Sequence, residues 1–382
     1  MAPAHIVGWG RYVPERVLTN DDLARTVDTS DEWIRTRTGI CERRIADDGE
    51  TTSSMAVQAA WRALETAGMS PSQLDLIIVA TATPDHAFPA TACLVQDALG
   101  ASNAAAFDLS AGCTGFVYAL GVAADMVDGR ACRSGNGEPG QGGLALVVGA
   151  ETLSRITDWT DRATCVLFGD GAGAVVLQAN DNQGGVLGTV LGADGSGGDL
   201  LILPAGGSGE PPSHRTVAER RHYLKMRGRE VFRFAVRAMP EAVRDVLHQS
   251  GLNAADIDLL IPHQANQRIL EVAAKALDLD PERVYSNLDR YGNTSAASIP
   301  MALCEAADQG LIQRDDLVVC VGFGAGLTWG ASAVRWSAPL PVGPPTVWRR
   351  SRYTVLQSYA WLRSLMRRFV RWLFSRGVRE ES

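Results

Sequence analysis

The amino-acid sequence predicts an α/β protein whose body consists of two related halves. Short apolar runs, typical of strands buried on both faces, alternate along the chain with segments of helical periodicity. In addition, residues 65–80 (ETAGMSPSQLDLIIVA) recur 183 positions later as residues 248–263 (HQSGLNAADIDLLIPH), which aligns Gly68 with Gly251 and Asp75 with Asp258. Each copy predicts a helix ending at Gly, a turn and a buried strand. Chance reuse of a common α/β unit is the alternative, but a spacing of roughly half the body favours duplication.

The other elements follow the same alternation. In the first half we expect helices over residues 89–99 and 113–128, and strands over residues 104–109, 144–148 and 173–177. In the second half we expect helices over residues 231–247, 267–277 and 298–307, and strands over residues 317–321 and 331–336. The glycine-rich residues 135–143 and 192–209 predict loops. This order favours mostly parallel sheets covered by helices on both faces, with halves at 1–179 and 180–337 and a tail at 338–382.

Composition and charge restrict the function. The 382 residues are 46% hydrophobic, enough for a large buried core, and 36 basic against 43 acidic residues give a net charge of −7. Such a chain is a poor candidate for binding nucleic acid across a broad face. The charge is uneven, because residues 338–382 hold nine Arg against Glu380 and Glu381, which leaves −14 on the preceding residues.

Cysteine usage and the N-terminal sequence indicate the compartment. The seven cysteines are odd in number and form no CxxC pair, so they fit neither a disulfide framework nor a zinc site, and we expect no metal. The start, MAPAHIVGWG, lacks the features of a secretory signal, and no run of about 18 apolar residues predicts a membrane span. We therefore expect a cytoplasmic protein.

Cys113 is the first candidate for chemistry. It lies in LSAGCTGFVY, where a strand ends, small residues allow a tight turn and a helix begins. The free N–H groups at a helix start favour thiolate over thiol, so we expect a lowered pKa and a nucleophilic sulfur. Taken alone, a free cysteine is more often a small core residue, and this reading also holds for the remaining six: Cys41, Cys93, Cys132, Cys165, Cys304 and Cys320.

His263 and Asn293 strengthen the case for Cys113. His263, in IPHQANQR, follows the repeated strand at its carboxyl end, the edge where open α/β sheets place ligands. Asn293, in YGNTSAASIP, precedes a helix, so N-capping is an alternative reading for it. Cys, His and Asn at element ends of a duplicated body indicate one catalytic site.

Two glycine-rich segments, GDGAGA from Gly169 and GFGAGLTWG from Gly322, superficially resemble dinucleotide loops. A phosphate-binding loop opens a helix, whereas each of these leads into a strand. We interpret them as tight turns, the second able to present a backbone N–H to a reacting oxygen.

Together the motifs AGCTGFVYAL, IPHQANQRI, GNTSAASIP, GFGAGLTWG, SDEWIRTRTGI and FGDGAGAVVL resemble the β-ketoacyl-[acyl-carrier-protein] synthase III family over about residues 5–336. The resemblance implies a thiolase-like fold with two related halves, each on a five-stranded mixed sheet, and a homodimer. It also implies the initiating condensation of type II fatty acid synthesis, in which an acyl-CoA and malonyl-acyl carrier protein give 3-oxoacyl-carrier protein, CoA and CO2. Both thioesters are substrates, and no cofactor is expected.

The resemblance assigns roles residue by residue. Cys113 would accept the acyl group, and His263 and Asn293 would stabilise the enolate left by decarboxylation of the malonyl thioester. The backbone N–H groups of Cys113 and Ala325 would form the oxyanion hole. The family usually has Gly where Ala325 stands, which affects backbone conformation rather than the N–H itself.

The resemblance also implies binding residues. Trp33, Arg37 and Arg162 would hold CoA, and Phe88 would reach the partner's acyl pocket at the dimer interface. The expected carrier-protein contacts are Gln264, Ala265, Asn266, Gln267, Arg268, Arg233 and Lys275. Arg229, Arg233 and Arg237, at spacings of four, independently predict a basic helix face that suits an acidic partner. A solvated surface and an ordinary packing tryptophan are the alternative readings.

Three rival functions stay open. A condensing enzyme of a polyketide or specialised lipid pathway would keep the same Cys, His and Asn. Type III polyketide synthases share the triad but usually act without a carrier protein. A non-catalytic carrier-binding subunit would have no need of Cys113.

The tail lies outside the resemblance. Pro339, Pro341, Pro344 and Pro345 predict a stiff linker. From Val355 a basic amphipathic helix of about 20 residues is expected. Its apolar stripe is Val355, Tyr359, Leu362, Met366, Phe369 and Leu373, enlarged by Trp361, Trp372 and Phe374, with Arg363, Arg367 and Arg371 on another face. We expect weak binding to anionic lipid; the alternative is that the stripe docks on the body or on a dimer partner.

Overall fold

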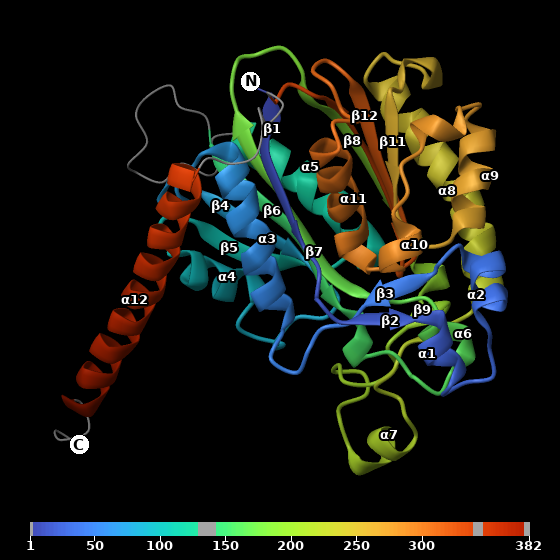
Figure 1. The fold of residues 1–382 in the computed structure, drawn as a ribbon, viewed down its shortest axis with the longest axis horizontal. Coiled ribbons are helices and arrows are strands. Elements are labelled where there is room, and N and C mark those ends of the chain that lie inside the picture. The colour runs from blue at the N-terminus through green and yellow to red at the C-terminus, as the bar shows by residue number, and fades with distance from the viewer. Residues whose placement is uncertain (1–2, 129–142, 339–346, 378–382) are drawn as a thin grey trace.

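Two stacked β-sheets separate three layers of helices (Figure 1). The computed structural model describes residues 3–128, 143–338 and 347–377. The five-stranded sheet has the order β1 (Ala4–Tyr12), β7 (Asp170–Ala179), β6 (Leu144–Thr152), β4 (Leu76–Ala80) and β5 (Ala105–Leu109). The four-stranded sheet has the order β11 (Leu259–Pro262), β12 (Leu317–Gly324), β13 (Thr328–Arg335) and β8 (Gly185–Ala193).

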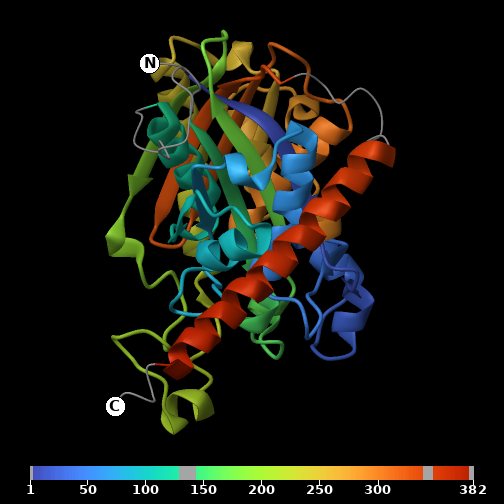
Figure 2. The same ribbon diagram turned by 90° about the vertical axis from the view of Figure 1, so that its left-hand side faces the viewer.

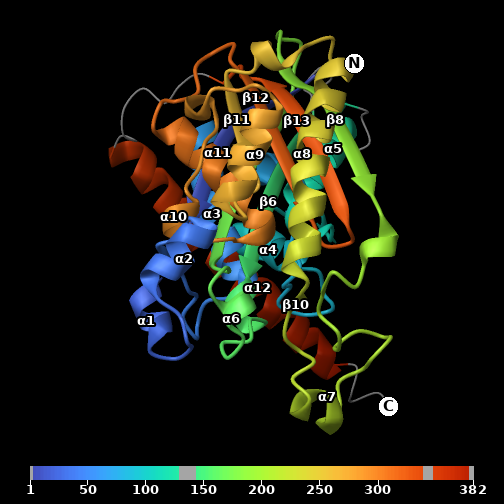
Figure 3. The ribbon, with the colours of Figure 1, turned by 90° about the vertical axis from the view of Figure 1, so that its right-hand side faces the viewer.

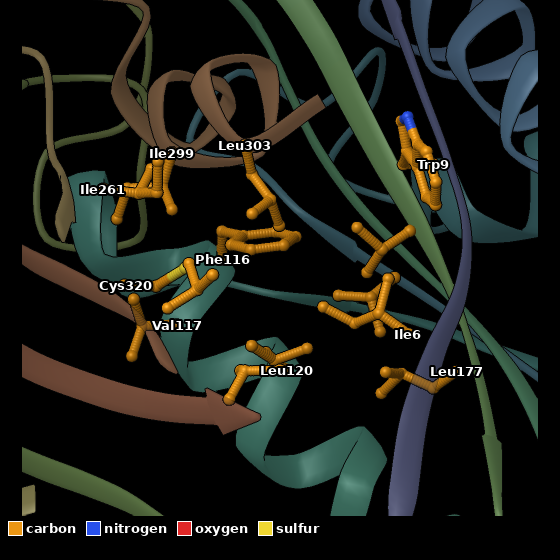
Figure 4. Close-up of a cluster of buried hydrophobic side chains, with 14 of the residues drawn as sticks. Ile6, Trp9, Phe116, Val117, Leu120, Leu177, Ile261, Ile299, Leu303 and Cys320 are labelled. Carbon is orange, nitrogen blue, oxygen red and sulfur yellow. The ribbon is translucent and has the colours of Figure 1, made fainter. Parts of the chain in front are cut away.

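The helices fill the layers around these sheets. Apolar side chains of α3 (Thr52–Ala67) and α4 (Thr91–Leu99) cover the outer face of the first sheet, and those of α8 (Gly228–Gln249) and α9 (Gln267–Ala276) cover the outer face of the second. Between the sheets lie α5 (Gly115–Asp128) and α11 (Ser298–Asp308). Their side chains, with Phe116, Val117 and Leu120 at the centre, form the core shown in Figure 4. This central layer is buried on every side because α5 and α11 are apolar around most of their circumference.

The duplicated architecture predicted from the repeat is confirmed. The order β1-β7-β6-β4 in the first sheet corresponds to β8-β13-β12-β11 in the second. The aligned aspartates form equivalent hydrogen bonds. The Asp75 carboxylate accepts a hydrogen bond from the Leu144 N–H at 3.0 Å, and the Asp258 carboxylate accepts one from the Leu317 N–H at 2.7 Å. In both halves this bond ties the turn before one strand to the start of its neighbour. The proposed boundary near residue 180 falls between β7 and β8.

Several expectations are corrected. The sheets are mixed rather than mostly parallel, because the β1–β7, β6–β7, β12–β13 and β8–β13 pairs are antiparallel. In the described residues the second sheet has four strands, and only an isolated bridge from Leu260 to Val284 takes the place of a fifth. The expected loop at 192–209 includes the end of β8 and β9 (Leu201–Ile202), which pairs with β10 (Lys225–Met226). Most of the expected loop at 135–143, and most of the insertion at 129–143, lie outside the described residues.

Smaller elements cover one end of the sheets. They are the strands β2 (Val17–Thr19) and β3 (Glu42–Arg44) and the helices α1 (Asn20–Ala24), α2 (Asp31–Thr38), α6 (Arg162–Cys165), α7 (His214–Ala218) and α10 (Leu288–Tyr291). Ile34 of α2 packs with Cys165 and Leu288 in a separate apolar cluster. The tail forms α12 (Val347–Gly377), which begins earlier than expected and lies along α3 and α4 (Figure 2). The proline-rich linker lies outside the described residues.

Candidate active site

Cys113 lies in a short 3-10 helix, Gly112–Thr114, between the end of β5 and α5. Gly112 has a φ of 52°, and a Cβ atom there would lie 3.0 Å from the backbone nitrogen of Ala325. A Cβ atom on Gly324 would lie 2.6 Å from the backbone nitrogen of Cys113. The two glycines therefore let the β12–β13 turn, which carries Ala325, approach this helix start closely.

Hydrogen bonds between the two halves hold this turn in place. The Thr328 hydroxyl donates to the backbone oxygen of Ala111 at 3.0 Å. The hydroxyl oxygens of Thr328 and Thr114 are also 3.0 Å apart. Because Thr328 begins β13, these bonds fix the second half against the helix start that carries Cys113.

His263 follows β11 and is 1% exposed. Its backbone N–H donates to the Val321 oxygen of β12 at 2.8 Å, and its ring meets the ring of Phe323 edge-on at a centroid distance of 5.3 Å. Burial lowers the pKa of His263 to about 3, so the imidazole is neutral at physiological pH. Its Nδ1 atom has no hydrogen-bond partner in the part of the chain that the structure describes.

Asn293 is 7% exposed and is held by bonds from both its backbone and its side chain. Its N–H donates to the Leu167 oxygen at 2.8 Å, and its carbonyl accepts from the Gly169 N–H at 3.0 Å. Its Oδ1 accepts from the Ser295 N–H at 2.8 Å, close to the capping role that was the alternative reading. With the side-chain oxygen used in this way, the amide NH2 group is the donor available for a substrate.

The structure places the segments that carry the three residues next to one another. The helix start at Cys113 packs against β12, the neighbour of β11, and against the 3-10 helix Ser295–Ala297 that follows Asn293. Each half therefore supplies part of one buried site: Cys113 comes from the first, and His263 and Asn293 come from the second.

Two site residues were missed by the sequence analysis. The Ser295 side chain lowers the pKa of the Cys113 thiol, and Ser295 has a φ of 48°, unusual outside glycine. Glu151, at the end of β6, is completely buried and accepts bonds from the Thr83 hydroxyl at 2.5 Å and the Ala82 N–H at 3.1 Å. A lone carboxylate in an otherwise apolar strand was a signal that could have revealed Glu151.

The expected lowering of the Cys113 pKa is wrong. Burial raises the pKa of the Cys113 thiol to about 12, and the Ser295 side chain opposes this only in part. The nearby Glu151 carboxylate also raises the pKa of Cys113. Burial raises the pKa of Glu151 as well. Desolvation by the surrounding core is therefore the largest influence on this pKa, and Cys113 rests as a thiol.

The three expected CoA residues form one cluster. Trp33 lies on α2, and the guanidinium carbons of Arg37 and Arg162 lie 4.4 Å and 5.0 Å from its ring centroid. The Arg162 guanidinium also donates to the backbone oxygen of Asp28 at 2.7 Å. An aromatic ring beside two cations fits an aromatic ligand that carries phosphates.

The expected carrier contacts fall into two groups. Arg229, Arg233 and Arg237 are exposed on α8, and Arg268 and Lys275 are exposed on the adjacent α9 (Figure 3). This basic face fits the expectation of an acidic partner.

The expectation that Gln264 contacts the carrier protein is wrong. Its side chain is buried, and all its polar groups form hydrogen bonds inside the protein. Its NH2 group donates to the Pro262 and Tyr285 oxygens, and its Oε1 accepts from Ser286 and Asn287. It cannot contact a carrier protein without breaking these bonds.

The next three residues of this run are half-buried. Asn266 caps α9 and donates to the Arg37 oxygen at 3.0 Å, while Gln267 packs closely under Gly39 and Ala265 joins the α8–α9 core. These contacts support α2 and the Trp33 cluster.

Phe88 is 86% exposed in the segment before α4, which suits a residue covered by a partner subunit. Among residues 3–128, 143–338 and 347–377, no group of three or more His, Cys, Asp or Glu side chains is arranged to hold a metal ion.

Comparisons with known proteins agree with this geometry. Residues 107–195 match the family 3-oxoacyl-[acyl-carrier-protein (ACP)] synthase III, and residues 247–336 match the C-terminal part of that family. The chain is 56% identical over 334 residues to a β-ketoacyl-[acyl-carrier-protein] synthase III of Caldanaerobacter subterraneus subsp. tengcongensis, covering 87% of this chain and 98% of the relative.

Solved structures are similar as well. The 3-oxoacyl-[acyl-carrier-protein] synthase III of Aquifex aeolicus VF5 superposes with a TM-score of 0.79 at 47% identity, over 87% of this chain and 100% of that chain. The priming β-ketosynthase of the R1128 polyketide biosynthetic pathway gives a TM-score of 0.79 at 36% identity, over 88% of this chain and 98% of that chain. The protein therefore has the thiolase-like fold and belongs to the β-ketoacyl-[acyl-carrier-protein] synthase III family, whose members are acyltransferase-type condensing enzymes of fatty acid synthesis.

Proposed function

We propose that this protein condenses an acyl-CoA with malonyl-acyl carrier protein to give 3-oxoacyl-carrier protein, CoA and CO2. The observation that supports this best is the convergence of Cys113, a neutral His263 and Asn293 on one buried site. A thiol suits acyl transfer, and two neutral donors suit an oxygen that becomes negatively charged only during the reaction.

In the first half-reaction the Cys113 sulfur attacks the carbonyl carbon of the acyl-CoA thioester. The N–H groups of Cys113 and Ala325 stabilise the oxyanion of the tetrahedral intermediate. When it collapses, the bond to the CoA sulfur breaks, and the proton of the Cys113 thiol ends on CoA. The raised pKa of Cys113 means that the thiol loses this proton as the sulfur attacks rather than beforehand.

In the second half-reaction the malonyl thioester oxygen accepts hydrogen bonds from a ring N–H of His263 and the NH2 group of Asn293. Loss of CO2 leaves its electron pair in an enolate, whose charge these donors stabilise. The enolate carbon attacks the acyl carbonyl carbon on Cys113, the Cys113 sulfur leaves as a thiolate, and a proton taken up from solvent restores the thiol. A positively charged imidazolium would also bind the malonyl carboxylate, which must leave as CO2. A neutral His263 stabilises the enolate without this effect, so its low pKa supports the proposed role.

Substrate and partner contacts are part of the proposal. Trp33 would stack on the adenine of CoA, and Arg37 and Arg162 would bind its phosphates. The exposed cations of α8 and α9 would receive the acidic carrier protein, with the phosphopantetheine reaching Cys113. We propose that the enzyme works without a cofactor, in the cytoplasm, as a homodimer in which Phe88 reaches the partner's acyl pocket.

A panel of acyl-CoAs, each incubated with malonyl-carrier protein and the enzyme, tests the proposal. Mass spectrometry should detect acylated Cys113 and 3-oxoacyl-carrier protein. The similarity to a polyketide priming β-ketosynthase favours one second candidate, a starter enzyme of such a pathway. That candidate predicts condensation onto a polyketide carrier protein and poor use of the fatty acid carrier protein. Acylation without condensation on either carrier would contradict both.

A further inference from the structure

The tail helix α12 docks on the body through its polar face. The Tyr353 hydroxyl lies between the backbone oxygens of Leu64 and Met69, 2.8 Å from each. The Ser364 hydroxyl donates to the Asp97 carboxylate at 2.5 Å, and Arg367 and Arg368 each lie 3.2 Å from the same carboxylate.

Close packing and further polar contact complete this interface. Ala360 packs against Gly100, where a Cβ atom would come within 3.2 Å of the Ala360 methyl group. The Arg363 guanidinium donates to the Ser102 hydroxyl at 3.2 Å. The helix is therefore attached to α3, α4 and the turn after α4 along one side.

The opposite half of α12 is apolar and faces outward. Its exposed large side chains, each 42–67% accessible, are Val355, Tyr359, Trp361, Leu362, Leu365, Met366, Phe369, Val370 and Trp372. The alternative prediction, that the apolar stripe docks on the body, is therefore wrong for Val355, Tyr359, Leu362, Met366 and Phe369. Exposed apolar surface of this extent, continuous along a helix, marks an interaction site.

The charge of α12 indicates what covers this face. The helix contains eight Arg and no Asp or Glu. At about 3.6 residues per turn, Arg363 and Arg368 fall at the two edges of the apolar half, and the Arg368 side chain stays 68% exposed beside Asp97. The alternative occupant is a second copy of this chain. In a two-fold dimer the apolar face of α12 would pack against the same face of the partner, which would bring two helices of eight Arg each close together, and their like charges would repel.

No helix among the described residues is long and apolar enough to cross a membrane. A helix apolar on one half, basic at the edges and flanked by Trp fits an orientation parallel to a lipid surface. We propose that the outward face of α12 binds in the plane of an anionic membrane, with the body attached through Asp97 and Tyr353.

Docking fixes how the bound enzyme would be oriented. Figure 1 places α12 at one end of the long axis, and α2, α8 and α9 at the other. If these elements bind CoA and carrier protein, as proposed above, both substrates approach from the side that faces away from the membrane. Binding would then retain the enzyme at the membrane without covering its substrate surfaces.

Vesicle binding of the full chain tests the proposal. We expect co-sedimentation with phosphatidylglycerol-containing vesicles, weaker binding to pure phosphatidylcholine vesicles, and release by salt. The double variant Leu362→Gln/Phe369→Gln should lose at least about tenfold in affinity, because it removes two apolar groups from the membrane-facing side. Val217→Gln/Leu311→Gln is the matched control, since both positions are exposed and apolar but lie elsewhere.

Other results would overturn the proposal. Equal sedimentation of the two double variants, or equal binding to both kinds of vesicle, would exclude this face as an anionic membrane site. Light scattering without lipid should give one mass for all three proteins. A smaller assembly formed by Leu362→Gln/Phe369→Gln alone would identify the face as a contact between copies.

Condensation measured on vesicles tests the orientation separately. Turnover should equal that in solution, and its loss on binding would contradict the outward-facing substrate side. Absence of turnover in solution as well would contradict the proposed function, not the membrane contact.

Discussion

At the scale of single residues, burial determines the protonation of the site. It raises the pKa of Cys113 to about 12 and lowers the pKa of His263 to about 3, so both groups are uncharged between these values. For His263 the unfolded chain binds a proton below about 6.5 whereas the folded chain does not. This group therefore contributes stability at neutral pH that is lost as the pH falls from about 6.5 towards 3.

The raised pKa of Cys113 predicts slow alkylation. With iodoacetamide, the rate at Cys113 should rise about tenfold per pH unit from pH 7 to 10 without levelling off, because only the thiolate reacts. Peptide mass spectrometry separates Cys113 from the exposed Cys93, which serves as an internal reference, and Cys113→Ser provides the blank. A rate that levels off below pH 8 would show a thiolate stabilised by the helix start or by His263.

His263→Ala and Asn293→Ala should separate the two half-reactions. Both variants should still acylate Cys113, since the backbone oxyanion hole remains, while malonyl decarboxylation should fall about 100- to 1,000-fold when one donor to the enolate is lost. In the wild type, decarboxylation should be flat between pH 6 and 8, because His263 does not titrate there. Decarboxylation retained in both variants, or an inflection near pH 6.5, would contradict the proposed roles.

Sequence reasoning located the three proposed catalytic side chains but not their surroundings. Cys113, His263 and Asn293 stand at predicted element ends, where motif and position agree. Glu151 and Ser295 interact with each other although they are 144 positions apart in the sequence. No local sequence pattern predicts such a contact. The wrong expectation for the Cys113 pKa has the same origin, because desolvation depends on the whole packed core.

At the scale of elements, strands with strong apolar runs were predictable and glycine-rich strands were not. β4 and β11 were found from the repeat, whereas β8 (GVLGTVLGA) was missed because its glycines suggest a turn. The structure explains one of them: a Cβ atom on Gly192 would clash with the Trp329 ring at 2.3 Å. Close approach of the neighbouring strand, invisible in a sequence, requires glycine there.

The basic face of α8 gives a prediction at this scale. Arg233→Glu should raise the KM for malonyl-carrier protein about 5- to 30-fold, the effect of about 1–2 kcal/mol lost from an interface charge. Acylation by acyl-CoA alone should be unchanged, because Trp33 and its arginines lie on other helices. Arg314→Glu, an exposed position away from α8 and α9, is the matched control. An equal effect of both reversals would indicate general charge steering rather than docking.

At the scale of the whole molecule, the five-layer body and α12 are separable. The alignment with the Caldanaerobacter relative spans 87% of this chain and 98% of the relative, and the family match ends at residue 336, before the tail. The helix itself was predictable from its periodicity. Which side it turns to the body was not, because Asp97, Leu64 and Met69 lie far from it in sequence.

The final prediction concerns a chain that ends at Ser337. Removing α12 deletes the buried Tyr353 and its bonds to Leu64 and Met69, a loss of about 1–3 kcal/mol after the cost of ordering the helix is subtracted. The thermal midpoint should fall by a few degrees while turnover in solution is retained, since the helix contacts α3 and α4 rather than the site. Hydrogen exchange should increase at residues 64–69 and 97–102. Tyr353→Phe in the full chain is the control, and it should lose about 1 kcal/mol of stability with the helix still present.

An unchanged midpoint together with unchanged exchange would mean that α12 does not stay docked in solution. The apolar face would then not be held outward by the body, and the fixed orientation at the membrane would no longer follow.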